Sequence, residues 1–99
     1  YTIIRENMII SFKHKGLKLL FINNNSKYVN PEHVSKIIRI LDRLDASTKP
    51  EDMKLPGYNL HELLGKEKGT WSVKVNGNWR ITFSFYGVDA TLVDYLDYH

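Results

Sequence analysis

Two runs of alternating apolar and polar residues, separated by three turn-forming residues, dominate the second half of this 99-residue chain. Residues 71–75 and 79–85 each place an apolar side chain at every second position, which is the pattern of a half-buried β-strand. Between them lies Asn76-Gly77-Asn78, and both residue types tolerate the positive φ that tight hairpin loops need. The sequence therefore predicts a β-hairpin with one apolar face and one polar face.

The register of this hairpin follows from its two faces. A two-residue turn would pair Val73 with a polar partner, because a slip of one residue turns every side chain over. A three-residue loop instead pairs Val73 with Ile81 and Val75 with Trp79, which keeps the apolar face in one piece. We therefore predict the three-residue loop.

The same register makes Lys74 and Arg80 cross-strand neighbours on the polar face. Two adjacent cations repel each other, so the pair is more stable when an anion lies between them. The alternative is that both side chains simply reach into water. From the charges alone, this second interpretation is the simpler one.

The first half of the chain predicts two helices to cover the apolar face. Leu17 and Leu20 begin an apolar helical spacing that a run of asparagines stops, and Asn30-Pro31 is a favourable helix start. His33, in the first turn of this longer helix, is expected at the surface. The other predicted features are a strand Ile9–Phe12, a helical stripe of Val34, Ile37, Ile38, Leu41 and Leu44, a loop over 46–56, and strands Tyr58–Leu60 and Ala90–Tyr95.

The fold class predicted from this order is α+β. An N-terminal strand and a two-helix hairpin pack on one face of a mainly antiparallel twisted sheet. Hydrophobic residues make up 42% of the chain, which fits a globular domain and not a disordered one. Residues 1–7 continue no pattern, so we expect them to be a non-native or upstream extension, and 8–99 to be a single domain.

The chain has no cysteine, which excludes disulfides and thiolate metal sites and suits a cytoplasmic location. No apolar run approaches the ~20 residues of a membrane span, and the start lacks a signal-peptide pattern. The net charge is +3. Basic residues cluster near the start and in the second half, a distribution compatible with a phosphate-rich partner: Lys13, His14, Lys15 and Lys18, then Lys66, Lys68, Lys74 and Arg80.

The last predicted strand leads into Asp97-Tyr98-His99, three side chains that handle protons. His61 is a further candidate, at the end of a short strand. No histidine pair has metal-ligand spacing, and no serine occupies a nucleophile elbow. We therefore expect neither a metal nor a cofactor.

Cleavage of RNA by its own 2′-hydroxyl fits these residues better. That reaction needs a base for the hydroxyl, an acid for the leaving 5′-oxygen and cations for the phosphate. His61 and the 97–99 triplet offer proton transfer, and Arg80 with Lys74 offers positive charge. Tyr98 is also suited to stack on a base.

Several segments together resemble one known family. The resemblance spans residues 8–99, and its most specific parts are Asn78-Trp79-Arg80-Ile81-Thr82-Phe83 and the ending Asp94-Tyr95-Leu96-Asp97-Tyr98-His99. The chain also carries Leu60-His61, Gly65, Gly69-Thr70-Trp71-Ser72-Val73-Lys74-Val75 and a matching start, Met8-Ile9-Ile10-Ser11-Phe12-Lys13-His14-Lys15-Gly16-Leu17. On these residues it is similar to the HigB (plasmid killer protein) toxins of the RelE superfamily.

The resemblance implies the toxin of a bacterial type II toxin–antitoxin pair that acts as a ribosome-dependent mRNA endoribonuclease. Such toxins cut mRNA in the A site of the small ribosomal subunit without a metal. Their partner is a HigA-type helix-turn-helix antitoxin, through which the complex meets operator DNA. Carried over to this chain, the catalytic residues are His61, Arg80, Asp97, Tyr98 and His99.

The resemblance also implies that Lys13, Lys15 and Lys18 meet ribosomal RNA. One departure is that some members carry a lysine where this chain has Leu64. Either Lys66 or Lys74 supplies that charge, or the charge is dispensable here.

Two alternative functions remain open from the sequence. One is a RelE-fold protein with weak or lost catalysis, which acts mainly as a corepressor in the antitoxin–DNA complex. The other is a basic RNA-binding module without toxicity. The intact Asp97-Tyr98-His99 ending favours the nuclease over both.

Overall fold

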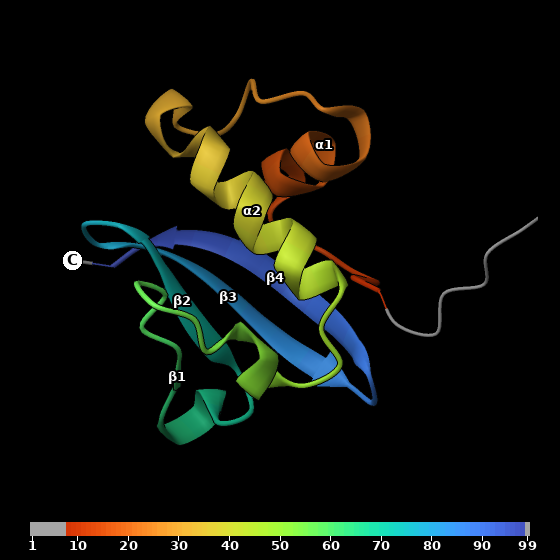
Figure 1. Cartoon of the computed structure of the whole chain (residues 1–99), viewed down its shortest axis with the longest axis vertical. Helices are drawn as coiled ribbons and strands as arrows, with labels where there is room; N and C mark the ends of the chain where they lie inside the picture. Colours follow the sequence, from red (N-terminus) through yellow and green to blue (C-terminus); the bar gives the residue numbers. More distant parts are fainter. Residues whose placement is uncertain (1–7, 99) are drawn as a thin grey trace, which may run out of the picture.

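The computed structural model describes residues 8–98, and the predictions for residues 1–7 and for His99 lie outside that range. Two helices, α1 (Lys15–Asn23) and α2 (Val34–Asp45), lie over one face of a four-stranded sheet (Figure 1). The strands are β1 (His61–Glu62), β2 (Trp71–Asn76), β3 (Trp79–Tyr86) and β4 (Asp89–Asp97). They pair in the order β1-β2-β3-β4, all antiparallel. The predicted α+β class is confirmed.

Local capping explains where the helices begin and end. The imidazole Nδ1 of His14 accepts a hydrogen bond from the Leu17 backbone N–H at 3.1 Å, which opens α1. Asn24 closes α1 in a left-handed conformation with φ of 57°. Asn30 caps as predicted, but the helix it opens starts with a 3-10 turn, η1 (Pro31–His33), before α2 begins.

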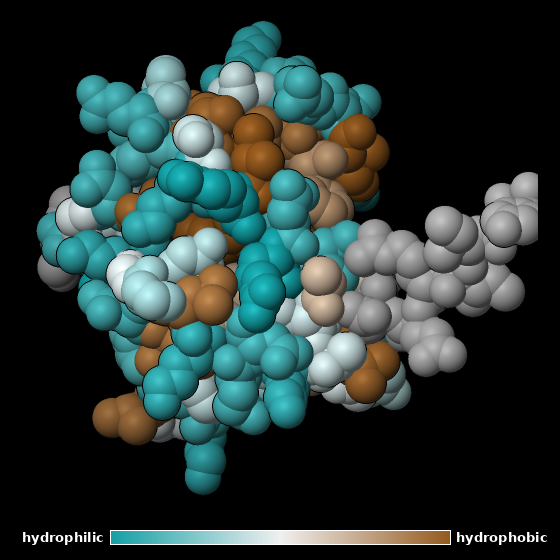
Figure 2. All heavy atoms as spheres, in the orientation of Figure 1, coloured by the Kyte–Doolittle hydropathy of each residue, from teal (hydrophilic) through white to brown (hydrophobic). Residues whose placement is uncertain are grey.

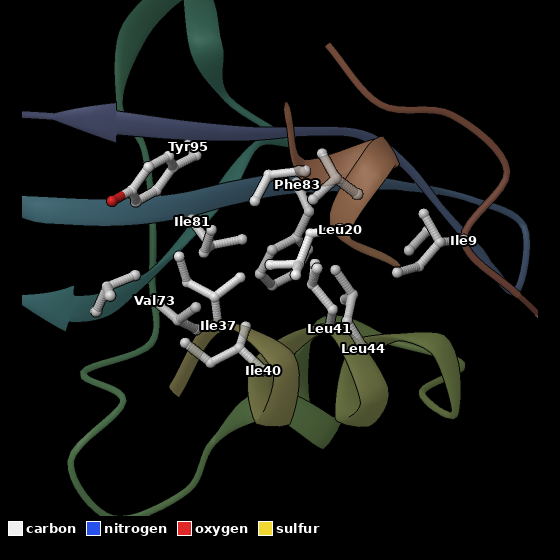
Figure 3. Packing of buried hydrophobic residues seen from close by; sticks show 14 of the residues in the cluster. Ile9, Leu20, Ile37, Ile40, Leu41, Leu44, Val73, Ile81, Phe83 and Tyr95 are labelled. Atoms are coloured by element: carbon white, nitrogen blue, oxygen red, sulfur yellow. The ribbon is translucent and has the colours of Figure 1, made fainter. Parts of the chain in front are cut away.

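The core lies between α2 and the sheet. Ile37, Ile40 and Leu41 point from α2 toward Ile81 and Phe83 of β3 (Figure 3). All five are fully buried, which makes this layer the main apolar contribution to stability. The predicted stripe missed Ile40, because the face of α2 that meets the sheet is wider than the narrow stripe read from the sequence.

The segment from Ile9 to Phe12 runs beside β4 (Figure 1). It forms two isolated parallel bridges there, Ile9 with Ala90 and Phe12 with Val93, so it is not a regular strand. The Asp45 carboxylate at the end of α2 accepts a hydrogen bond from the Ile9 backbone N–H at 2.9 Å. This buried bond ties the start of the described chain to the helical layer.

The hairpin register is confirmed in part. Val73 pairs with Ile81 and Lys74 pairs with Arg80, as predicted. The loop prediction is wrong, because Asn76 pairs with Trp79 and the turn has two residues. A bulge between positions 74 and 76 absorbs the extra residue, so the apolar face stays continuous without the longer loop.

Three further predictions differ from the structure. The short strand predicted at Tyr58–Leu60 instead forms three residues later, as β1, and β4 extends beyond Tyr95 to Asp97. The segment predicted as a polar loop contains a 3-10 turn, η2 (Pro50–Met53), whose Met53 is fully buried. An apolar residue in a polar stretch can still enter a core when a turn directs it inward.

The prediction that His33 lies at the surface is wrong. His33 is only 3% exposed, and its Nδ1 lies 2.6 Å from the Tyr95 hydroxyl. Its ring also packs edge-on against Trp79, with ring centroids 5.6 Å apart. Position 33 precedes Ile37 by four residues and Ile40 by seven, so the helical spacing already places it on the face of α2 that meets the sheet.

Candidate active site

The sheet face opposite α1 and α2, here called the open face, is defined by strand pairing. Because directly paired residues share a face, His61, Ser72, Thr82 and Asp94 form one row across all four strands. The next row contains Lys74, Arg80 and Leu96. In the view of Figure 2, hydrophobic residues gather around the helices, and hydrophilic residues cover most of the remaining surface.

A small hollow of about 60 Å³ lies on the open face beside β3 and β4. Tyr98 borders it together with Thr82 and Asp94. The 3-10 turn η3 (Gly65–Glu67) contributes Glu67 to the lining of the hollow. The remaining lining residues are Lys13, Leu63, Thr70, Ser84, Leu92 and Leu96.

Two buried side-chain atoms of the described chain have no hydrogen-bond partner, and both belong to open-face residues. They are the Ser72 hydroxyl and the Nη1 nitrogen of Arg80. Buried polar atoms without partners are rare in folded proteins, since each one costs free energy. Arg80 as a whole is half-buried, so its guanidinium, beside the Lys74 strand position, can still meet an anion that approaches this face.

Three charged groups near Tyr98 affect the pKa of its phenol. Burial raises the pKa of its phenol above the ordinary value, and the carboxylates of Glu67 and Asp94 raise this pKa further, while Arg80 lowers it. The Tyr98 backbone N–H donates to the Asn78 carbonyl at 2.8 Å, which extends the pairing past the end of β4. Tyr98 is therefore a protonated donor at neutral pH, held at the same end of the sheet as Arg80.

His61 is exposed at the outer strand of the same face. Its Nδ1 lies 3.0 Å from the Asn59 carbonyl oxygen. A carbonyl can only accept, so this bond places the proton on Nδ1 and leaves Nε2 free to accept. Three strand spacings, roughly 14 Å, separate the lines of β1 and β4, so His61 and the β4 end face the same side without touching.

Asp97 lies differently from its neighbour. It pairs with Trp79 of β3, and successive side chains of a strand point to opposite faces. Its carboxylate raises the pKa of Tyr95, after the larger effect of burial on that phenol. The structure thus brings Arg80 and Tyr98 together, sets Asp97 toward the helical side, and leaves His99 outside the described range.

The predicted basic residues divide into separate groups. Lys13 lines the hollow with Tyr98, and Lys74 pairs with Arg80. Lys15 and Lys18 are exposed on α1, and Lys66 is exposed in η3. Leu64 is 90% exposed.

The sequence analysis missed three residues on or beside the open face: Ser72 and Asp94 of the sheet, and Glu67 of η3. The alternation of β2 and β4 held the signal for two of them, because Ser72 shares a face with Lys74, and Asp94 with Tyr98. Glu67 could not have been found in this way. It reaches the hollow from a turn between strands, and no periodic pattern reports such a position.

Two further findings concern the described residues only. Between residues 8 and 98, no group of three or more His, Asp or Glu side chains is arranged to hold a metal ion. Within the same range, no helix is long and apolar enough to cross a membrane.

The architecture of two helices on one face of an antiparallel sheet, with a cationic and phenolic site on the other face, defines a RelE-like α+β protein. The family model for the RelE-like toxin HigB of type II toxin–antitoxin systems matches residues 10–99. The chain is 45% identical over 92 residues to "Endoribonuclease HigB" of Proteus vulgaris, covering 93% of this chain and 100% of that protein.

A second relative is "Toxin HigB-1" of Vibrio cholerae serotype O1 (strain ATCC 39315 / El Tor Inaba N16961), 30% identical over 95 residues. That match covers 93% of this chain and 98% of the relative. The chain belongs to the HigB-like toxins. The resemblance to this family that the sequence motifs indicated is confirmed.

Proposed function

We propose that this toxin is an endoribonuclease that cleaves mRNA in the ribosomal A site by attack of the RNA 2′-hydroxyl. The observation that carries the proposal is the buried, unpartnered Nη1 of Arg80 on the open face, next to the Lys74 position. A buried guanidinium nitrogen without a partner is costly, although the Arg80 side chain as a whole is only half-buried. A bound phosphate oxygen would relieve that cost, and the stabilisation would grow as charge develops on the reacting phosphate.

In this reaction the 2′-oxygen forms a bond to the adjacent phosphorus, and the bond from phosphorus to the 5′-oxygen breaks. One proton leaves the 2′-hydroxyl and one joins the 5′-oxygen. We assign Arg80 and Lys74 to the phosphate charge. His61, Tyr98 and His99 form the proposed proton-transfer group, and Asp97, which pairs with Trp79 toward the helical side, is left out of it.

The surroundings of two of these residues suggest different roles. Tyr98 has a raised pKa because of burial, Glu67 and Asp94, which suits it to donate a proton and not to accept one. The Nε2 of His61 is the free acceptor when Nδ1 donates to the Asn59 carbonyl. We assign His61 to the 2′-hydroxyl and Tyr98 to the leaving oxygen.

The size of the hollow supports dependence on the ribosome. Its volume of about 60 Å³ is well below the roughly 300 Å³ of a small-molecule pocket, so it does not enclose a nucleotide. Alignment of the 2′-hydroxyl with the phosphorus must then come from the surface on which the mRNA is held. We propose that the small ribosomal subunit supplies it, with Lys13, Lys15, Lys18 and Lys66 meeting RNA.

The remaining parts of the proposal follow from the toxin family. We propose a HigA-type helix-turn-helix antitoxin as the partner, contact with operator DNA through that antitoxin, and a cytoplasmic location. Growth arrest on expression, relieved when the antitoxin is supplied in the same cell, tests this part. Unimpaired growth with soluble wild-type toxin would favour the corepressor function instead.

Cleavage of a defined mRNA, with and without ribosomes, tests the nuclease itself. Primer extension should map cuts to the A-site codon only when ribosomes are present. A single 2′-deoxynucleotide at the cut position should abolish that cut, since the nucleophile is gone. Equal cleavage of naked mRNA, or of the deoxy-substituted mRNA, contradicts the proposed mechanism.

A further inference from the structure

A second basic surface lies at the outer edge of β2, away from the hollow beside Tyr98. Here called the basic groove, it has a volume of about 280 Å³ and is lined by Lys36 and Arg39 of α2 and by Pro56 and Tyr58 of the following loop. The ammonium of Lys36 lies 5.9 Å from the Tyr58 ring centroid. Helix and loop together thus present two cations and an aromatic ring to one groove.

The charged groups that shift the pKa of Lys36 are both cations. Burial lowers the pKa of Lys36, and the nearby charges of Lys74 and Arg39 lower this pKa further. Both side chains whose charge affects Lys36 are therefore cations, Lys74 and Arg39. Positive charges gathered in this way attract a polyanion.

The groove is continuous with the proposed active site through Lys74. The Lys74 backbone N–H donates to the Tyr58 carbonyl at 2.7 Å, which fixes the loop against the edge of β2. On its other side Lys74 pairs with Arg80 of β3. Positive side chains therefore follow one another from Arg80 through Lys74 to Lys36 and Arg39, around the sheet edge.

We propose that the basic groove binds the phosphate backbone of the mRNA strand next to the cleaved nucleotide. This inference rests on the proposed function, because it extends the strand held at Arg80 over the edge of β2. A single strand fits the continuity of the cations better than a separate partner does, since one chain of phosphates can meet all four in order. Tyr58 adds an aromatic surface of the kind that single-strand binders use.

Salt-dependent binding of a 2′-O-methylated single-stranded RNA oligonucleotide tests the proposal without ribosomes and without cleavage. The double variant Lys36→Gln/Arg39→Gln removes both groove charges from α2. Each phosphate neutralised on a single strand contributes about 0.7 to the slope of log affinity against log salt. The variant should therefore reduce the slope by about 1.4, measured by fluorescence anisotropy.

The matched control is Lys27→Gln/Lys49→Gln, which removes the same net charge from exposed positions outside the groove. Lys27 also lies over a tyrosine ring, at 5.5 Å from the Tyr28 centroid, so it reproduces the chemistry of Lys36. The control should leave the slope near that of the wild type. Thermal unfolding of both variants should match the wild type, because none of the four residues belongs to the core.

Equal slopes for the two double variants would overturn the proposal. So would a groove variant that loses affinity only for mRNA-free small subunits or only for the antitoxin, since the occupant would then be ribosomal RNA or protein. The outcome is separable from that of the nuclease proposal. If the groove variant has a reduced slope but the wild-type toxin does not cleave mRNA on ribosomes, the groove is supported and the nuclease proposal is overturned. If the wild type cleaves but the groove variant keeps the wild-type slope, the nuclease proposal is supported and the groove is overturned.

Discussion

The two faces of the sheet share the same strands but differ in how their polar atoms are paired. On the helix-covered face, buried His33 meets the Tyr95 hydroxyl at 2.6 Å, and buried Asp45 accepts from a backbone N–H. On the open face, Ser72 and Arg80 each bury a polar atom that has no partner within residues 8–98. Paired polar atoms contribute stability, whereas unpaired buried atoms cost stability until a ligand pairs them.

This comparison makes the expected effects of mutation separable. Changes on the helix-covered face should lower the free energy of unfolding and leave the intrinsic cleavage rate alone. Changes on the open face should lower the cleavage rate and leave the free energy of unfolding nearly unchanged.

The largest expected effect is on stability, for Phe83→Ala. Phe83 is fully buried against α2, so the variant should lose roughly 3–5 kcal/mol of unfolding free energy. Urea unfolding measures this loss, with Phe83→Leu as a milder control that keeps most of the volume. A loss below about 1 kcal/mol would show that the core does not depend on this layer.

The next effect is on activity, for Arg80→Gln. Loss of one preorganised charge at the phosphate should lower the single-turnover cleavage rate on ribosomes on the order of 10²-fold. Unfolding free energy should stay within about 1 kcal/mol or rise, because an unpaired buried nitrogen is removed. Arg43→Gln, at an exposed arginine of α2, should cleave like the wild type. A large loss of unfolding free energy in Arg80→Gln would contradict this prediction, because Arg80 would then be needed for the fold.

A smaller effect is expected for Tyr98→Phe, which keeps the aromatic ring and removes the phenolic hydroxyl that would donate the proton. We expect a rate reduced on the order of 10-fold or more, since general acid catalysis contributes at least that much. Because burial, Glu67 and Asp94 raise the Tyr98 pKa, the phenol stays protonated below its raised pKa, and activity should fall only as alkaline pH approaches that pKa.

The pH–rate profile tests this assignment. The alkaline fall should disappear in Tyr98→Phe and move to lower pH in Glu67→Gln, which removes one of the charges that raise the pKa. A fall that moves to higher pH in Glu67→Gln would contradict the assignment.

The smallest effect on activity is expected for Tyr95→Phe, on the helix-covered face. The variant leaves the buried ring nitrogen of His33 without its hydroxyl partner, which should cost about 1–3 kcal/mol of unfolding free energy. The cleavage rate of the folded variant should stay within about twofold of the wild type, a change of less than 0.5 kcal/mol. A rate loss as large as that of Tyr98→Phe would mean that the two faces are not independent.

Local patterns were sufficient to predict most of the fold. The alternation in β2 and β3 fixed the pairing of Lys74 with Arg80, and Asn30-Pro31 located the start of the helical segment. The errors arose where local rules compete. The bulge near Val75 shifts the pairing by one residue, and only contacts made across the sheet select it. His33 was misjudged because a polar residue in a first helical turn was expected in water, although its spacing from Ile37 and Ile40 places it on the buried face.

The site was predictable to a smaller extent. Arg80 could be placed on the polar face from its strand register. The chemistry of their side chains singled out His61 and the 97–99 triplet, and the family resemblance gave them a substrate. The distance between His61 and the end of β4 depends on strand order, which motifs do not contain. Glu67 and the groove residues Lys36 and Arg39 come from a turn and a helix that carry no catalytic signature.

Photo-crosslinking from the A-site codon tests most directly whether the open face meets the RNA. An mRNA with 4-thiouridine in that codon, and a 2′-deoxynucleotide at the cut position to prevent cleavage, would be bound to ribosomes with the wild-type toxin. Crosslinked peptides should contain open-face residues near Thr82 and Tyr98. Crosslinks confined to α1 and to the C-terminal half of α2, with none on β3 or β4, would contradict the division of the sheet into a stabilising face and a catalytic face.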